Sequence, residues 1–143
     1  SVMSPGRLEP VRRDPTVLVD AAHNPAGAAA LAAALSESYT FFETTAVIAV
    51  MADKDVVGIL APLRTCVDRV IATQNSSERC LPAGALAEAA TEVFGADAVD
   101  LEPDLAAALG VAIRHAEQSG GGVVVTGSVV TAGDARRILR ESE

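Results

Sequence analysis

Short apolar runs alternate with longer helical patterns along this chain, after a polar lead. The first run, residues 17–19, is Val-Leu-Val, and it predicts a short strand, buried on both faces, that extends to Asp20. Further apolar runs predict strands at residues 46–51, 69–73, 98–101 (near a sheet edge) and 123–125. Helical patterns predict helices over residues 25–36, 56–65, 82–94 and 104–118, and from residue 131 onward. This alternation predicts a three-layer α/β fold, a mostly parallel sheet with helices on both faces.

Individual residues mark where several helices begin or end. Asn24 is the predicted N-cap of the first helix, with Pro25 at the first helical position. Pro62 predicts a kink or an early end in the second helix. Thr131 and Asp134 stand at the spacing of a capping box at the start of the last helix. The clearest apolar stripe, with spacings of three and four, comprises Leu105, Ala108, Leu109, Ala112, Ile113 and Ala116.

Polar residues follow the predicted strands at the point where each strand ends. They are Asp20 and His23, then Asp53, Lys54 and Asp55, then Thr73 with the loop 74–79, and finally Thr126, Gly127 and Ser128. Because the carboxyl ends of parallel strands share one edge of a sheet, these groups are expected to converge there. A helix start at the same edge favours phosphate. The sequence therefore predicts a nucleotide site.

Each of these candidates also has an ordinary structural interpretation. Asp20 could accept hydrogen bonds from the hydroxyls of a ribose, or it could cap the helix that follows. His23 could contact a phosphate or a substrate carboxylate, or be structural. Lys54 could hold an anionic substrate, or belong to a charged turn. Gly127 would let a ligand approach the backbone closely, and His115, which lies off the apolar stripe, is expected to be solvated.

The composition of the chain narrows the classes of function. The net charge of −8 and the pI near 4.7 argue against nucleic acid as the main partner, because binding its phosphates needs clustered Lys and Arg. No apolar run approaches the roughly 18 residues of a membrane span. Cys66 and Cys80 form no CxxC pair and have no His at metal-ligand spacing. We therefore expect a cytoplasmic protein with two reduced thiols and no metal site in this domain.

The loops that usually hold the phosphates of a nucleotide are missing. The sequence has neither GxGxxG after a strand nor GxxxxGK[ST]. The three glycines at residues 120–122 precede a predicted strand, whereas a dinucleotide fingerprint follows one. The chain thus has polar groups suited to a nucleotide but no loop that wraps its phosphates, which suggests half of a site.

Four motifs occur in order at spacings that resemble a known family. They are Pro5-Gly6-Arg7, Asp20-Ala21-Ala22-His23-Asn24-Pro25, Met51-Ala52-Asp53-Lys54-Asp55 and Thr126-Gly127-Ser128. Together they resemble the C-terminal domain of folylpolyglutamate synthase, including its bifunctional dihydrofolate synthase form, in the folate branch of the Mur ligase superfamily. The resemblance covers about residues 4–143. It implies a Rossmann-like domain over residues 1–143, with the P-loop and the Mg²⁺ ligands on an N-terminal ATPase domain that is absent from this chain.

The resemblance also implies roles for individual residues. Arg7 and Asp20 would bind ATP. His23, as a catalytic residue, and Ser128 would lie where the incoming glutamate meets the transferred phosphate. Lys54 and Asp55 would belong to a characteristic substrate-binding loop at the same cleft.

The implied reaction is ATP-dependent amide formation. A folate or dihydropteroate carboxylate would attack the γ-phosphate of MgATP, and the α-amine of L-glutamate would then attack the acyl phosphate. Such chemistry depends on positioning and on charge stabilisation by cations. We expect the isolated domain to be inactive, with its own N-terminal ATPase domain as its partner, and the enzyme to be a monomer.

The sequence is also compatible with two other classes of protein. One is a stand-alone nucleotide-binding or regulatory α/β domain without catalysis. The other is a receiver-like signalling domain, which needs an aspartate where this chain has Thr73 and a lysine after the last strand. Lys54, the only lysine, follows the second strand instead.

Overall fold

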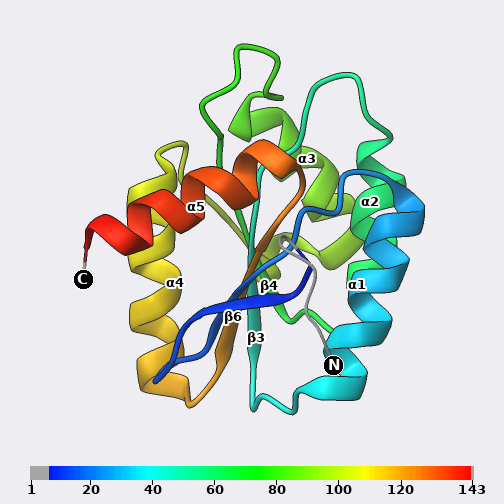
Figure 1. Cartoon of the computed structure of the whole chain (residues 1–143). Helices are drawn as coiled ribbons and strands as arrows, with labels where there is room; N and C mark the ends of the chain where they lie inside the picture. Colours follow the sequence, from blue (N-terminus) through cyan, green and yellow to red (C-terminus); the bar gives the residue numbers. More distant parts are fainter. Residues whose placement is uncertain (1–6, 143) are drawn as a thin grey trace.

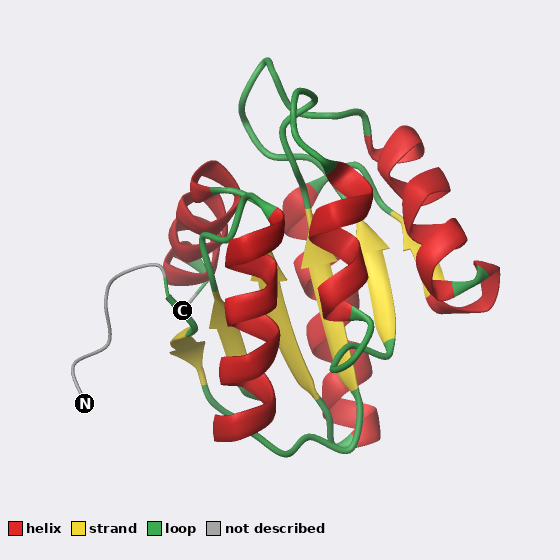
Figure 2. Ribbon diagram, turned by 90° about the vertical axis from the view of Figure 1, so that its right-hand side faces the viewer, coloured by secondary structure: helices red, strands yellow, loops and turns green. Residues whose placement is uncertain are grey.

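The computed structural model of the chain describes residues 7–142 as a six-stranded sheet between two layers of helices (Figures 1 and 2). The strands are β1 (Glu9–Arg12), β2 (Val17–Val19), β3 (Thr44–Ile48), β4 (Arg69–Ala72), β5 (Val99–Leu101) and β6 (Gly122–Thr126). The helices are α1 (Pro25–Ser38), α2 (Val56–Leu63), α3 (Ala83–Phe94), α4 (Leu105–Ser119) and α5 (Val129–Glu141), with a short 3₁₀ helix at Ala96–Ala98. The strand order is β1-β2-β6-β3-β4-β5, and every pair is parallel except β1 with β2. The predicted fold class is confirmed.

The core lies in two parts, one on each face of the sheet. In β2, Leu18 packs with the buried residues of α1, α2 and α3, whereas Val17 and Val19 pack with those of α4 and α5. Figure 1 shows α1 and α2 on one side of the strands and α4 and α5 on the other. This two-sided burial explains why β2 is apolar at consecutive positions and not at alternate ones.

Several sequence signals act as predicted. The side chain of Asn24 caps α1 by accepting a hydrogen bond from Gly27 N at 2.7 Å, and Pro25 is the first helical residue. α2 ends at Leu63, one residue after Pro62 and two residues before the predicted end. The apolar stripe of α4 is buried as predicted, apart from Ile113, which is only partly buried.

Two strands differ from the prediction. β1 was predicted as part of a polar lead, and it forms an antiparallel edge strand whose Glu9 pairs with Val19. Pro10 and the charged residues of this segment are not typical of a strand, so the sequence pattern did not predict one. An edge strand tolerates both kinds of residue. β3 begins at Thr44 and ends at Ile48, whereas the apolar run predicted residues 46–51.

The predicted capping box of α5 is wrong. α5 begins at Val129, and its N-cap is Ser128, whose Oγ accepts a hydrogen bond from Thr131 N at 3.0 Å. The carboxylate of Asp134 instead accepts hydrogen bonds from Ser76 N and Oγ at 2.7 and 3.1 Å. The position of the helix is therefore set by Ser128 and by a loop more than fifty residues earlier in the chain.

The prediction for His115 also needs correction. Its ring is half-buried, and Nε2 contacts the carboxylate of Glu43, so the side chain is not simply solvated. In the part of the chain that the structure describes, no helix combines the length and the apolar character needed to cross a bilayer.

Candidate functional site

The loops that follow the parallel strands meet at the carboxyl edge of the sheet, at the top of Figure 1. The loop after β3 and the loop after β4 are joined by backbone hydrogen bonds, from Ala52 N to Arg79 O and from Leu81 N to Val50 O, both 2.8 Å long. The start of β3's loop is joined to β6 by a third bond, from Ala49 N to Thr126 O at 3.2 Å. These bonds hold the segments that carry the candidate residues side by side.

Asp20 is buried at the end of β2, with 7 % of its surface exposed. Its Oδ2 accepts a hydrogen bond from Leu8 N at 2.9 Å, and its Oδ1 accepts one from Ala22 N at 2.8 Å. Burial raises the pKa of this carboxyl, while these two hydrogen bonds and the nearby charge of Arg7 oppose the rise. Asn24 caps α1, so the alternative in which Asp20 caps that helix is wrong.

Arg7 lies at the same edge of the sheet because of the antiparallel register of β1. Glu9 pairs with Val19, so the chain before β1 continues beyond the carboxyl end of β2. Arg7 is exposed, and its charge acts on Asp20. A buried acid and an exposed guanidinium therefore lie together at this corner.

His23 stands in the turn between β2 and α1. Its side chain is exposed, and Nδ1 lies 3.2 Å from the carbonyl oxygen of Ala21. If this nitrogen carries the proton, Nε2 is left as an acceptor. The imidazole is thus held by the backbone at one nitrogen and open at the other.

Lys54 and Asp55 stand in the loop between β3 and α2. Asp55 caps α2, with Oδ1 accepting a hydrogen bond from Gly58 N at 3.0 Å. Lys54 is half-buried, and its amine has no hydrogen-bond or ion-pair partner within residues 7–142. A Cβ on Gly58 would lie 2.8 Å from Cγ of Pro25, so the first turns of α1 and α2 are in contact. His23 and Asp55, which precede these two turns, therefore stand near each other.

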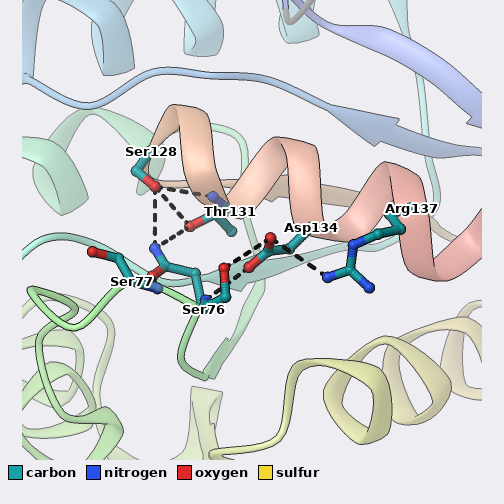
Figure 3. A network of polar contacts seen from close by, with 7 residues as sticks. Ser76, Ser77, Ser128, Thr131, Asp134 and Arg137 are labelled. Atoms are coloured by element: carbon teal, nitrogen blue, oxygen red, sulfur yellow. Dashed lines mark hydrogen bonds and ion pairs between the residues drawn. The ribbon is translucent and has the colours of Figure 1, made fainter.

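Ser128 is buried, with 3 % of its surface exposed, and its hydroxyl takes part in a polar network (Figure 3). Its Oγ lies 3.2 Å from Nδ2 of Asn75 and 3.0 Å from Oγ1 of Thr131. The hydroxyl of Thr131 donates to the carbonyl oxygen of Ala49 at 2.7 Å. The network thus ties the loops after β3, β4 and β6 together.

The sequence places the loop 74–79 at this edge but does not single out Asn75 within it. Asn75 reaches Ser128 and Thr131 across 53 and 56 residues of sequence. The run Asn-Ser-Ser at residues 75–77 is a signal for a polar loop, but it does not reveal partners so far away.

Gly127 is required by the packing of the chain itself. Gly127 has φ +119°, and a Cβ placed on it would lie 2.2 Å from the carbonyl oxygen of Ala49. The space beside the glycine is therefore filled by the chain itself. Gly127 serves the close approach of β6 to the loop after β3.

The described residues contain no group of three His, Cys, Asp or Glu side chains placed to hold a metal ion. Cys66 and Cys80 are free thiols, and burial raises the pKa of both. The sulfur of Cys80 accepts a hydrogen bond from Asn75 N at 3.3 Å and so helps to shape the loop after β4.

All six residues singled out from the sequence, namely Arg7, Asp20, His23, Lys54, Asp55 and Ser128, lie at or beside this one edge. The parallel sheet, its two helical layers and this polar edge define a Rossmann-like α/β domain. Residues 6–129 match the family described as "Mur ligase, glutamate ligase domain", and the chain belongs to that family.

The chain is also similar to individual proteins. The chain is 46 % identical to the dihydrofolate synthase/folylpolyglutamate synthase of Mycobacterium tuberculosis, in a match that covers 97 % of the chain and 31 % of that protein. It superposes with TM-score 0.93 and 48 % identity on a structure of Mycobacterium tuberculosis folylpolyglutamate synthase complexed with ADP and AMPPCP, covering 97 % of the chain and 33 % of that structure.

A bifunctional folylpolyglutamate synthase/dihydrofolate synthase with Mn, AMPPNP and L-glutamate bound also superposes. The TM-score is 0.77 and the identity 29 %, over 96 % of the chain and 32 % of that structure. The chain therefore spans about a third of the length of these relatives.

Proposed function

We propose that this chain is the glutamate-ligase domain of an ATP-dependent enzyme that adds L-glutamate to folates. The observation that carries the proposal is the 46 % identity, over nearly the whole chain, to an enzyme named for that activity. The gathering of Arg7, Asp20, His23 and Lys54 at one edge supports it, because these are the charged and titratable groups that a nucleotide and an amino acid require. The phosphate-binding loop is then supplied by an N-terminal ATPase domain in the same protein.

In this proposal Arg7 and Asp20 form the part of the ATP site that this domain contributes. The guanidinium of Arg7 is exposed and can stack on a base or pair with a phosphate. Each oxygen of Asp20 accepts one backbone hydrogen bond and keeps a second acceptor site for a ribose hydroxyl. The two bonds also hold the segments that carry Arg7 and His23, so Asp20 orders this corner of the site.

The glutamate and the transferred phosphate belong, in this proposal, on the side of the edge that carries Lys54, His23 and Ser128. Lys54 has no hydrogen-bond or ion-pair partner among the described residues, so its amine is available to a carboxylate or a phosphate. His23 has an open ring nitrogen for a catalytic proton transfer or an anion contact. Asp55 places the first turn of α2 beside them.

The reaction that fits these groups has two steps. A folate carboxylate oxygen attacks the γ-phosphorus of ATP, ADP leaves, and an acyl phosphate forms. The α-amine of glutamate then attacks the acyl carbon, the tetrahedral intermediate expels phosphate, and the amine loses a proton. Lys54 would stabilise negative charge in both steps, and His23 would accept that proton. We assign the ligands of Mg²⁺ to the N-terminal domain.

The experiment that tests this proposal is an assay of glutamate addition by the full-length protein. Purified protein is incubated with MgATP, labelled L-glutamate and either dihydropteroate or a reduced folate. We expect labelled product and ADP to form together, one per turnover, whereas the 143-residue chain alone forms neither. A folded full-length protein that adds glutamate to no folate acceptor contradicts the proposal and favours a nucleotide-binding or regulatory domain.

A further inference from the structure

The side-chain amide of Asn75, in the loop after β4, contacts the start of α5. Its Nδ2 donates hydrogen bonds to Ser128 Oγ at 3.2 Å and to Thr131 Oγ1 at 3.1 Å. Its Oδ1 accepts a hydrogen bond from Ser77 N at 2.9 Å, which settles the orientation of the amide, because the flipped amide would place N–H groups against an N–H group.

This network is closed, in the sense that its two hydroxyls keep no unpaired hydrogen or lone pair. Ser128 Oγ accepts from Asn75 Nδ2 and from Thr131 N, and it donates its own hydrogen to Thr131 Oγ1. Thr131 Oγ1 accepts from Ser128 and Asn75 and donates to Ala49 O. Every donor and acceptor of both hydroxyls is used within the chain. In this arrangement the Ser128 hydroxyl has no hydrogen or lone pair left for a substrate, and it fixes where α5 begins.

Because both hydroxyls are buried, the loss of one hydrogen bond in this network would be costly. Thr131 is fully buried and Ser128 nearly so, so a hydroxyl that lost its partner there would find no solvent to replace it. Directly after Ser128, Val129 is exposed by 64 % at the carboxyl edge. The amide of Asn75 therefore governs the first exposed turn of α5 from a separate loop.

We propose that Asn75 is a positioning residue for the glutamate side of the site. By donating to both hydroxyls, it sets the rotamers of Ser128 and Thr131 and so the placement of the first turn of α5. This inference rests on the proposed function, which places Ser128 beside the incoming glutamate. Asn75 itself touches no substrate.

Asp134 provides a matched control. It also joins the loop after β4 to α5, by hydrogen bonds from Ser76, but it does not contact the Ser128 hydroxyl. Asp134→Ala therefore loosens the same loop without removing a bond to Ser128. Asn75→Asp keeps the shape of the amide but removes both donors, so it separates the effect of hydrogen bonding from the effect of packing.

The kinetic test compares Asn75→Ala, Asn75→Asp and Asp134→Ala with the wild type in the full-length protein. Both Asn75 variants are expected to raise the KM for glutamate at least about tenfold, because small misplacements at a site are costly, and to leave the KM for ATP within about twofold. Asp134→Ala is expected to lower the Tm but to leave both KM values near those of the wild type. A glutamate KM unchanged in Asn75→Ala, or raised equally in Asp134→Ala, overturns the inference.

A second readout is independent of activity. Hydrogen exchange of the Thr131 backbone N–H, which donates to Ser128 Oγ, is measured by NMR in the 143-residue chain. Exchange is expected to quicken more in Asn75→Ala than in Asp134→Ala, and equal rates contradict the positioning of Ser128 by Asn75. A wild-type full-length protein that adds no glutamate contradicts the proposed function instead, so the two failures are distinguishable.

Discussion

Oδ2 of Asp20 lies 2.9 Å from the backbone nitrogen of Leu8 and accepts its hydrogen bond, so the end of β2 is joined to the segment just before β1. Leu8 has φ +45°, a left-handed conformation that is costly for a residue with a branched side chain, and its side chain is buried. The hydrogen bond to Asp20 and the burial of Leu8 together hold this conformation. The position of Arg7 follows from it.

The stability of the chain is expected to depend on pH through Asp20. Burial holds the pKa of Asp20 above its ordinary value of 3.8, because the charged carboxylate loses solvation when the chain folds. Its contribution is complete below the unfolded pKa and is lost as the pH rises through the folded pKa. Asn does not titrate. The free energy of unfolding of the wild type minus that of Asp20→Asn should therefore fall as the pH rises past 3.8, the ordinary pKa of the carboxyl. Denaturant unfolding at each pH measures it, and a difference that rises with pH contradicts this reading.

Asp20→Ala is expected to weaken ATP binding in the full-length protein. The substitution removes both the proposed acceptor for ribose hydroxyls and the hydrogen bond to Leu8 N, which holds the segment that carries Arg7. We predict a rise in the KM for ATP of roughly tenfold, the equivalent of about 1.4 kcal/mol. Steady-state kinetics with varied ATP measure it, and an unchanged KM for ATP rules out the ribose assignment.

Two buried threonines at this edge are expected to respond in opposite ways to the same substitution. The hydroxyl of Thr126 is buried and has no hydrogen-bond partner within residues 7–142, whereas that of Thr131 bonds to Ala49 O and Asn75. Thr126→Val should therefore leave the free energy of unfolding unchanged or raise it by about 1 kcal/mol. Thr131→Val should lower it by about 2 kcal/mol. Denaturant unfolding of both variants checks the pair, and equal effects contradict the assigned hydrogen bonds.

Gly127 and Gly133 form a second matched pair. A Cβ on Gly127 would collide with the carbonyl oxygen of Ala49 at a backbone φ of +119°, whereas a Cβ on Gly133, inside α5, meets nothing within 4 Å. Gly127→Ala should cost about 3 kcal/mol or more. Gly133→Ala should stabilise the chain by about 0.5–1 kcal/mol, because alanine is the better helix former. Thermal unfolding measures both, and a tolerated Gly127→Ala would contradict the close packing of β6 on the loop after β3.

Periodicity and capping residues predicted most of the architecture because they act locally. The consecutive apolar residues of β2 required burial on both faces, and Asn24 with Pro25 marked the start of α1 correctly. The edge strand β1 was missed because Pro10 and its charged neighbours are unusual in strands. Only an edge strand such as β1, which pairs with one neighbour, tolerates them.

The site was predictable in location but not in its internal contacts. Because parallel strands end at one edge, the polar residues after them could be placed together from the sequence. The partners of Asp20 and Ser128 could not, since Leu8 is 12 residues from Asp20 and Asn75 is 53 residues from Ser128. The start of α5 was misplaced for the same reason: Thr131 and Asp134 have the spacing of a local cap, but their partners come from other loops.

The proposed role of the carboxyl edge in glutamate ligation can be measured by a charge-matched comparison of two residues, one at each end of α2. Lys54 precedes the first turn of α2 at that edge, and the exposed Arg64 follows its last turn at the other end. In the full-length protein, Lys54→Ala should lower kcat/KM for glutamate addition roughly tenfold or more, because a hydrogen bond to a charged group contributes about 1.5–3 kcal/mol. Arg64→Ala should leave it unchanged. Equal values for the two variants would contradict the account.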